Sequence, residues 1–295
     1  MIRHPSVPPQ TEVPAPIPTG LSPRGHALFP VRCVLFDIYG TLFISASGDI
    51  GAAEMTPDTR RALAGLMQTY GLTNTPDALV DTLHATIRRE HRQRRQTGSD
   101  HPEIEIDRIW SELIGDRSID TIRDFASKFE SIVNPVYPMP HAAETLSVLK
   151  RYHVRMGIIS NAQFFTPRLF DAFFGSSTDL LGFDADLIRY SYRVGHAKPS
   201  PVLFESVLER LERDAIRPSQ VLYVGNDMRN DIYPAHRTGM QTALFAGDRR
   251  SLRLRKNDPC CKNLMADIVI TDLIQLLQRV RFEPASHSSG ERHED

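Results

Sequence analysis

The chain has 295 residues, of which 41% are hydrophobic and 24% are charged, and its formal net charge is −1. This composition is ordinary for a globular protein, and the near-neutral charge gives no reason to expect nucleic acid as a partner. No segment approaches the roughly 20 apolar residues of a membrane span, and the N-terminus lacks the apolar core of a signal peptide. We therefore expect a cytoplasmic protein with no nucleic-acid or membrane partner.

The two ends of the chain have the composition of tails. Residues 1–30 include eight prolines and few large apolar side chains, so they cannot build a core. They predict a Pro-rich disordered leader. The polar segment 282–295 predicts a disordered tail for the same reason.

The first strong structural signal is the apolar run 31–36, which is followed by Asp37 and a tight turn over 38–43. This pattern is typical of a buried strand that ends on a carboxylate. An ionised carboxylate in such a place is costly unless a cation or several hydrogen-bond donors meet it. Asp37 therefore indicates a functional site.

The next part of the chain, residues 46–134, predicts helices with no strand between them. Apolar residues recur there at helical spacing over 57–70, 76–96, 106–114 and 118–133. We interpret residues 46–134 as a helical cap, inserted directly after the first strand of another domain.

Beyond residue 135, predicted helices alternate with short apolar strands. The strands are expected at 154–159, near 187, at 220–224, at 242–245 and at 268–270. Alternation of this kind builds a parallel sheet that helices cover on both faces. The predicted fold class is α/β, with a Rossmann-like parallel core formed by residues 31–45 and 135–281.

In open parallel sheets, ligands bind beyond the carboxyl ends of the strands, and four polar groups fall at such places. They are Asp37, the pair Ser160 and Asn161, Lys198, and the acidic cluster 225–231. A carboxylate, a hydroxyl, an ammonium and a second acidic group suit the handling of an anion with a divalent metal. Each also has a simpler explanation: Asp227 and Asp231 could cap a helix, and Lys198 could be an ordinary surface residue.

These four segments, in this order and with a helical insertion after the first, resemble the haloacid dehalogenase (HAD) superfamily over residues 31–281. The resemblance implies that Asp37 is the nucleophile and forms an aspartyl intermediate. It implies that Lys198 steadies the nucleophile and the substrate charge, and that Ser160 binds the transferred group. We further expect Thr41 and Asn161 to contact a substrate phosphate, because the turn at Thr41 can present backbone N–H groups.

In phosphatase members of that family a Mg²⁺ ion is held by the nucleophile, a backbone carbonyl and acidic residues of the fourth motif. The implied ligands are Asp37, the carbonyl of Tyr39, Asp227 and Asp231. The resemblance thus implies Mg²⁺ as the cofactor and a small phosphorylated molecule as the substrate.

The chain departs from the phosphatase pattern in one place and from the dehalogenase pattern in another. Tyr39 stands where phosphotransfer members carry a second Asp as general acid and base, and this resembles the dehalogenating branch. The acidic cluster resembles phosphatases, although Asn226 replaces the usual Asp after Gly225, and Phe204 replaces a tyrosine of dehalogenases. We expect a Mg²⁺-dependent phosphatase. The alternatives are a metal-independent 2-haloacid dehalogenase and a catalytically weakened HAD-fold binding or regulatory protein.

Two further expectations concern the substrate. Because Tyr39 replaces the general acid, we expect a preference for phosphates with a phenol or acyl leaving group, which needs less proton assistance. The basic run 249–256 could attract an anion, but its lack of aromatic neighbours favours a solvated loop.

Overall fold

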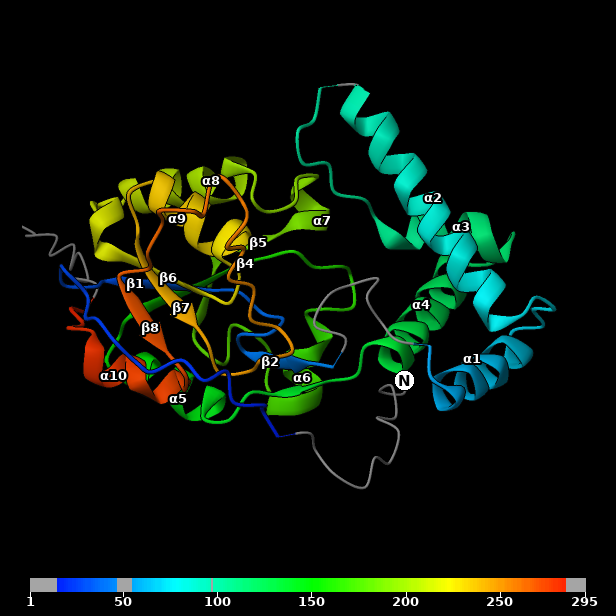
Figure 1. Cartoon of the computed structure of the whole chain (residues 1–295), viewed down its shortest axis with the longest axis horizontal. Coiled ribbons are helices and arrows are strands. Elements are labelled where there is room, and N and C mark those ends of the chain that lie inside the picture. The colour runs from blue at the N-terminus through cyan, green and yellow to red at the C-terminus, as the bar shows by residue number, and fades with distance from the viewer. Residues whose placement is uncertain (1–14, 47–54, 97, 285–295) are drawn as a thin grey trace, which may run out of the picture.

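A six-stranded sheet forms the centre of the molecule in the computed structural model, which describes residues 15–46, 55–96 and 98–284. Its spatial order is β5-β4-β1-β6-β7-β8, and every neighbouring pair is parallel (Figure 1). The strands are β1 (Cys33–Phe36), β4 (Arg155–Ser160), β5 (Phe183–Tyr190), β6 (Val221–Gly225), β7 (Gln241–Phe245) and β8 (Ile268–Ile270). The predicted α/β fold with a Rossmann-like parallel sheet is confirmed.

The central strand β1 is buried on both faces, as its uninterrupted apolar run requires. Because side chains alternate along a strand, Val34 and Phe36 pack into one hydrophobic core and Cys33 and Leu35 into another. The helices that cover the two faces are α5 (Ala142–Arg151), α6 (Arg168–Phe174), α7 (Ser191–Val194), α8 (Pro201–Glu212), α9 (Tyr233–Arg237) and α10 (Leu276–Arg279).

The register of the central strands brings three chain segments together at one edge. Phe36 at the end of β1 pairs with Ile158 of β4 and with Val224 of β6. The residues that follow these strands therefore emerge side by side. This register places Asp37 between Ser160 and the 225–231 segment.

Four helices form a separate layer beside the sheet (Figure 1). They are α1 (Pro57–Thr69), α2 (Pro76–Gln96), α3 (Ile106–Ile114) and α4 (Ile119–Val133), and all of them were expected from apolar spacing. Thr56 and Ser118 cap α1 and α4 by accepting backbone N–H groups of the first turn. The helices share a core around Leu83, Trp110 and Phe125. The helices lie within the range predicted for a cap, and the exact domain boundaries stay a prediction.

A short antiparallel pair of strands, β2 (Phe43–Ser45) and β3 (Val136–Pro138), flanks the insertion on its two sides. Local periodicity did not predict this pair, because strands of three residues carry little pattern. It joins the end of the β1 loop to the chain that returns from α4. Three short irregular helices, η1 (Pro218–Gln220), η2 (Met228–Ile232) and η3 (Leu273–Gln275), complete the core, and η2 is a π-helical turn.

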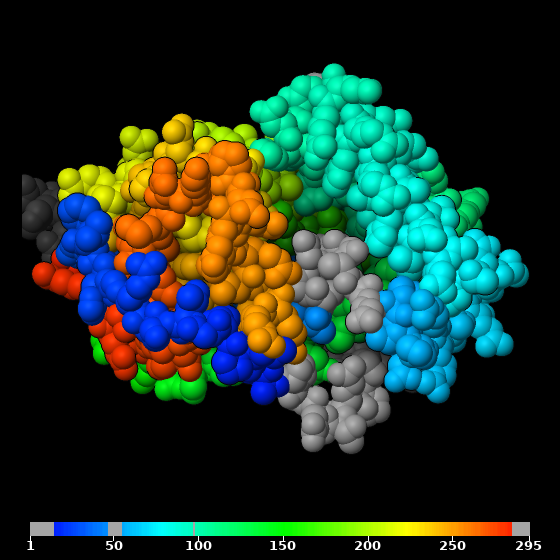
Figure 2. All heavy atoms as spheres, viewed as in Figure 1, coloured from blue at the N-terminus to red at the C-terminus, as the bar shows by residue number. Residues whose placement is uncertain are grey.

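The expectation of a disordered leader is wrong for residues 15–30. Arg24 forms an antiparallel bridge with Val269 of β8, and the N–H groups of Leu28 and Phe29 donate to Oε1 of Gln241 at 2.7 and 3.0 Å. Figure 2 shows this segment, in blue, lying on the surface of the core. The physical reason is that β8 is an edge strand, whose unpaired backbone groups accept another chain segment. Residues 1–14 lie outside the described residues.

The C-terminal tail begins later than expected. Phe282 bridges Val31, and the N–H of Glu283 donates to the carbonyl of Val31 at 2.9 Å. Residues 282–284 therefore belong to the folded core, and residues 285–295 lie outside the described residues. Within the described part of the chain, none of the helices has the length and apolarity needed to cross a membrane.

Candidate active site

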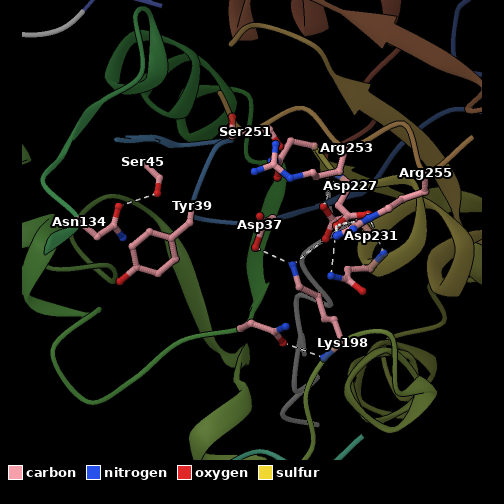
Figure 3. A pocket seen from close by; sticks show the side chains of 13 residues that line it. Asp37, Tyr39, Ser45, Asn134, Lys198, Asp227, Asp231, Ser251, Arg253 and Arg255 are labelled. Atoms are coloured by element: carbon pink, nitrogen blue, oxygen red, sulfur yellow. Dashed lines mark hydrogen bonds and ion pairs between the residues drawn. The ribbon is translucent and has the colours of Figure 1, made fainter. Parts of the chain in front are cut away.

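Asp37 lies directly after β1, with only 8% of its side chain exposed. Its Oδ1 accepts a hydrogen bond from Ser160 Oγ at 2.8 Å. The same oxygen accepts another from Lys198 Nζ at 2.6 Å (Figure 3). Ser160 comes from the end of β4 and Lys198 from the loop before α8. These donors supply the partners that a buried carboxylate requires, so the expected juxtaposition of the three residues is present.

Lys198 is a buried cation shared by two carboxylates. Its Nζ lies 2.6 Å from Asp37 Oδ1 and 2.6 Å from Asp231 Oδ1, and its side chain is 4% exposed. Burial opposes the ammonium charge, but Asp231 and Asp37 outweigh this effect and raise the pKa of Lys198. Lys198 is therefore held as a cation against Asp37.

Asn161 fixes the segment that carries this lysine. Its Oδ1 accepts the backbone N–H of Lys198 at 2.7 Å. The amide therefore acts on the site by positioning Lys198, and it also lines the cavity in front of Asp37. Its expected contact with substrate stays a prediction.

Asp231 closes the buried charge network from the side of β6. Its Oδ1 faces Lys198, and its Oδ2 accepts the backbone N–H of Asp227 at 2.9 Å. Burial raises the pKa of Asp231 above its usual range, and the charge of Lys198 opposes that rise. Gly225 allows this approach, because a Cβ at that position would collide with the Asp231 side chain.

Asp227 has two structural roles. Its Oδ1 accepts the N–H groups of Arg229 and Asn230 at 2.8 and 3.3 Å, so it caps η2. Its Oδ2 forms an ion pair with Arg255 Nη2 at 2.7 Å. The capping role considered for Asp227 from the sequence is therefore present, and its negative charge already has a cationic partner.

Tyr39 directs its phenol away from Asp37 (Figure 3). Its hydroxyl lies 2.9 Å from Thr166 Oγ1, and its ring packs against the core. Burial raises the pKa of this phenol further above its ordinary value. The hydroxyl is therefore in no position to donate a proton to a group bound beside Asp37.

Thr41 supports the loop after β1 from within. Its side chain is fully buried, its Oγ1 lies 3.3 Å from Asn226 Oδ1, and its N–H donates to the carbonyl of Ile38. Gly40 has a φ of 79°, and its N–H donates to the carbonyl of Phe43. Both N–H groups are used within the turn. The phosphate contact predicted for Thr41 therefore stays a prediction.

A cavity of about 110 Å³ opens in front of Asp37. It collects Asp37, Asn161, Lys198, Asp227 and Asp231, all of them candidates from the sequence. It is also lined by Asn230 of the 225–231 cluster and by Ser251, Arg253 and Arg255 of the basic run 249–256. Ser45 and Asn134, which line it too, were not selected from the sequence.

The basic run is in part a solvated loop, as expected, since Arg249, Arg255 and Lys256 are exposed, but Arg253 and Arg255 also line the cavity. The signal that could have found them was present, since the basic run follows a strand at the same edge of the sheet. No sequence pattern indicated Ser45 or Asn134. They stand on either side of the inserted helices in the chain, and Ser45 Oγ donates a hydrogen bond to Asn134 Oδ1 at 2.8 Å.

The carboxylates of this site are already paired with protein cations. In the part of the chain that the structure describes, no group of three or more His, Cys, Asp or Glu side chains could hold a metal ion. Arg255 forms an ion pair with Asp227, and the single cation of Lys198 is shared by Asp231 and Asp37. The ligand set expected for Mg²⁺ therefore stays a prediction.

Comparison with known proteins gives a consistent family. The family model described as haloacid dehalogenase-like hydrolase matches residues 31–239. A phosphoglycolate phosphatase from Shigella boydii serotype 4 (strain Sb227) is 28% identical over 213 residues, which make up 71% of this chain and 79% of that protein.

Solved structures share the fold. A HAD phosphatase from Thermococcus onnurineus superposes with a TM-score of 0.52 at 19% identity, over 85% of this chain and 100% of its own. A 2-haloacid dehalogenase from Pseudomonas syringae pv. Tomato DC3000 superposes with a TM-score of 0.54 at 20% identity, over 84% of this chain and 97% of its own. The resemblance stated from the four motifs is thus confirmed. The chain belongs to the haloacid dehalogenase-like hydrolases.

Proposed function

We propose that this hydrolase is a phosphatase that uses Asp37 as its nucleophile and acts on a small phosphorylated molecule. The observation that carries the proposal is a buried carboxylate, held by Lys198 and Ser160, in a cavity that Arg253 and Arg255 also line. Cations beside a nucleophile suit a phosphoryl group, whose oxygens carry negative charge in the transition state. The phosphatase relative described above supports the same class of substrate.

In the proposed reaction, a carboxylate oxygen of Asp37 attacks phosphorus. A bond forms between that oxygen and phosphorus, and the bond from phosphorus to the leaving oxygen breaks. Water then attacks the aspartyl phosphate, releases inorganic phosphate and restores the carboxylate. Lys198 offsets the charge of the nucleophile and of the phosphoryl group, and Ser160 orients Asp37 through its hydroxyl.

The place of Tyr39 sets the kind of leaving group. Its hydroxyl bonds to Thr166 and faces away from Asp37, so the leaving oxygen receives no proton from this residue. A positioned general acid contributes about 10² to 10⁴ in rate. The proposed enzyme therefore prefers aryl and acyl phosphates, whose leaving groups depart from phosphorus without such help.

Magnesium is the cofactor that the family resemblance implies, with Asp37, the Tyr39 carbonyl, Asp227 and Asp231 as its ligands. Binding there would require Asp227 to exchange Arg255 for the metal, and no step above depends on it. When bound, the ion would supply further positive charge to the phosphoryl oxygens. We retain Mg²⁺ dependence as a prediction.

The test is a grid of substrates and conditions. Purified protein, Asp37→Asn and the surface control Asp120→Asn are assayed with an aryl phosphate, an acyl phosphate and a 2-haloacid, each with Mg²⁺ or with EDTA. We expect phosphate release from both phosphates, abolished by Asp37→Asn and unchanged by Asp120→Asn. Phosphate release only in the presence of Mg²⁺ would establish the metal dependence.

Two outcomes would replace the proposal. Halide release that is insensitive to EDTA would show a 2-haloacid dehalogenase, the reading that Tyr39 favours. Binding of an anion without turnover in any arm would show a binding or regulatory protein that has kept the fold.

A further inference from the structure

A second and larger cavity adjoins the one that contains Asp37. Its volume is about 600 Å³, and it lies between helices α2, α3 and α4 and the loop that follows β4. Asn134 and Asn161 line both cavities. A molecule whose phosphoryl group faces Asp37 can therefore extend past these two amides into the larger space.

The two cavities differ in volume, and each suits a different part of a substrate. About 110 Å³ in front of Asp37 is room for a phosphoryl group and little else, and the charged lining there suits that group. About 600 Å³ falls within the size range of sites that enclose an organic molecule of drug size. The larger cavity is thus the place for the rest of the substrate.

The chemistry of the larger cavity is mainly aliphatic and aromatic. Leu83 and Ile87 of α2, Trp110 of α3, Phe129 of α4 and Phe165 of the loop after β4 all contribute to its wall. Trp110 and Phe129 contact each other edge to face, with ring centroids 4.7 Å apart. A wall of this kind gains most from an apolar or aromatic ligand, because such a ligand removes the apolar surface from water.

Polar and charged groups also occur at this wall: His84, Arg88 and His91 of α2 line it, as do Glu130, Asn134 and Gln163. Asn134 Nδ2 donates to Glu130 Oε1 at 3.0 Å, and Gln163 Nε2 donates to the carbonyl of Ile104 at 2.9 Å. The amides of Asn134 and Gln163 are thus engaged within the protein, and apolar side chains form the larger part of the wall. A leaving group as small as a two-carbon acid would leave most of the apolar wall in contact with water.

We propose that the larger cavity binds a bulky apolar leaving group, so that the substrates of this enzyme are phosphate esters of phenols with an extended aromatic body. This inference rests on the proposed phosphatase function and deepens it. It also agrees with the place of Tyr39, since a phenol leaves phosphorus without a proton donor more readily than an alkyl alcohol does.

The test compares phenyl phosphate with 2-naphthyl phosphate, whose leaving phenols have similar acidity and differ in size. We expect kcat/KM to be at least about tenfold higher for the naphthyl ester, as extra apolar surface in a fitting pocket provides. Ile87→Trp, which fills the cavity from α2, should bring the naphthyl-to-phenyl ratio close to one. Ala85→Trp, which places the same side chain at an exposed position of α2, should leave the ratio unchanged.

A binding measurement separates this inference from the proposed function. Asp37→Asn is titrated calorimetrically with both esters, and we expect about tenfold tighter binding of 2-naphthyl phosphate. Tighter naphthyl binding without turnover in the native protein would refute the phosphatase and keep the apolar site. Equal kcat/KM and equal affinity for the two esters would overturn the inference. An unchanged naphthyl-to-phenyl ratio of kcat/KM in folded Ile87→Trp would overturn it too. If that variant does not fold, the comparison of the two esters with the native protein still decides.

Discussion

Replacing Lys198 by methionine should lower the free energy of unfolding by about 3–5 kcal/mol and strongly reduce phosphate release. Methionine matches the length of the lysine stem and removes the charge. The change deletes a buried ammonium that lies 2.6 Å from Asp37 and 2.6 Å from Asp231. Both carboxylates would then lack their cationic partner in a site that excludes most water.

The magnitude follows from the two distances and the burial. With an effective dielectric constant of about 20, a charge pair at 2.6 Å gains roughly 6 kcal/mol of attraction. The cost of removing each ion from water offsets several kcal/mol of this gain, so the native network stabilises the fold only modestly. Removing the Lys198 ammonium leaves two carboxylates buried without the ion-pair attraction that offset their desolvation. Changes of this kind lower the free energy of unfolding by about 3–5 kcal/mol.

The measurement is urea unfolding of four proteins: the native chain, Lys198→Met, Asp231→Asn and the double variant. In the double variant the carboxyl of residue 231 is replaced by a neutral amide, so we expect it to be at least about 1 kcal/mol more stable than additivity predicts. Phosphate release should not recover, because Asp37 still lacks its cation. Additive effects of the two changes, or a Lys198→Met protein as stable as the native one, would refute the reasoning.

Three further changes follow from the same contacts. Tyr39→Phe should alter phosphate release by less than about threefold, since its hydroxyl faces away from Asp37, and a hundredfold loss would place the phenol in the reaction. Glu130→Gln should stabilise the protein more at pH 8 than at pH 5. Burial raises the pKa of the Glu130 carboxyl from 4.5 to about 7. The native chain therefore loses about 1–3 kcal/mol of unfolding free energy as the pH rises through that range, and the glutamine variant does not. An equal difference in unfolding free energy at the two pH values would contradict this. Arg255→Gln should raise Mg²⁺ affinity, measured by calorimetry, about fivefold or more, because it releases Asp227 from its ion pair. The neighbouring control Lys256→Gln should leave the affinity unchanged. Unchanged affinity in Arg255→Gln would show that the ion pair does not compete with the metal.

The sequence by itself determined the fold class and the centre of the site. The apolar run before Asp37 could only be a buried strand, and alternating helices and strands could only build a parallel sheet. Parallel strands present their carboxyl ends at one edge, so Asp37, Ser160 and Lys198 were expected to meet there. These inferences held because each depends on a local pattern and one general rule of topology.

The tertiary structure decided which charges pair and which groups face the site. No local pattern indicates that Arg255 reaches Asp227, that the Tyr39 hydroxyl lies against Thr166, or that α2, α3 and α4 enclose an apolar cavity. Such contacts join residues far apart in the chain, and their formation depends on how whole elements pack. The same reason explains why residues 15–30, which have the composition of a disordered leader, instead bond to the folded core, with Arg24 bridging the free edge of β8.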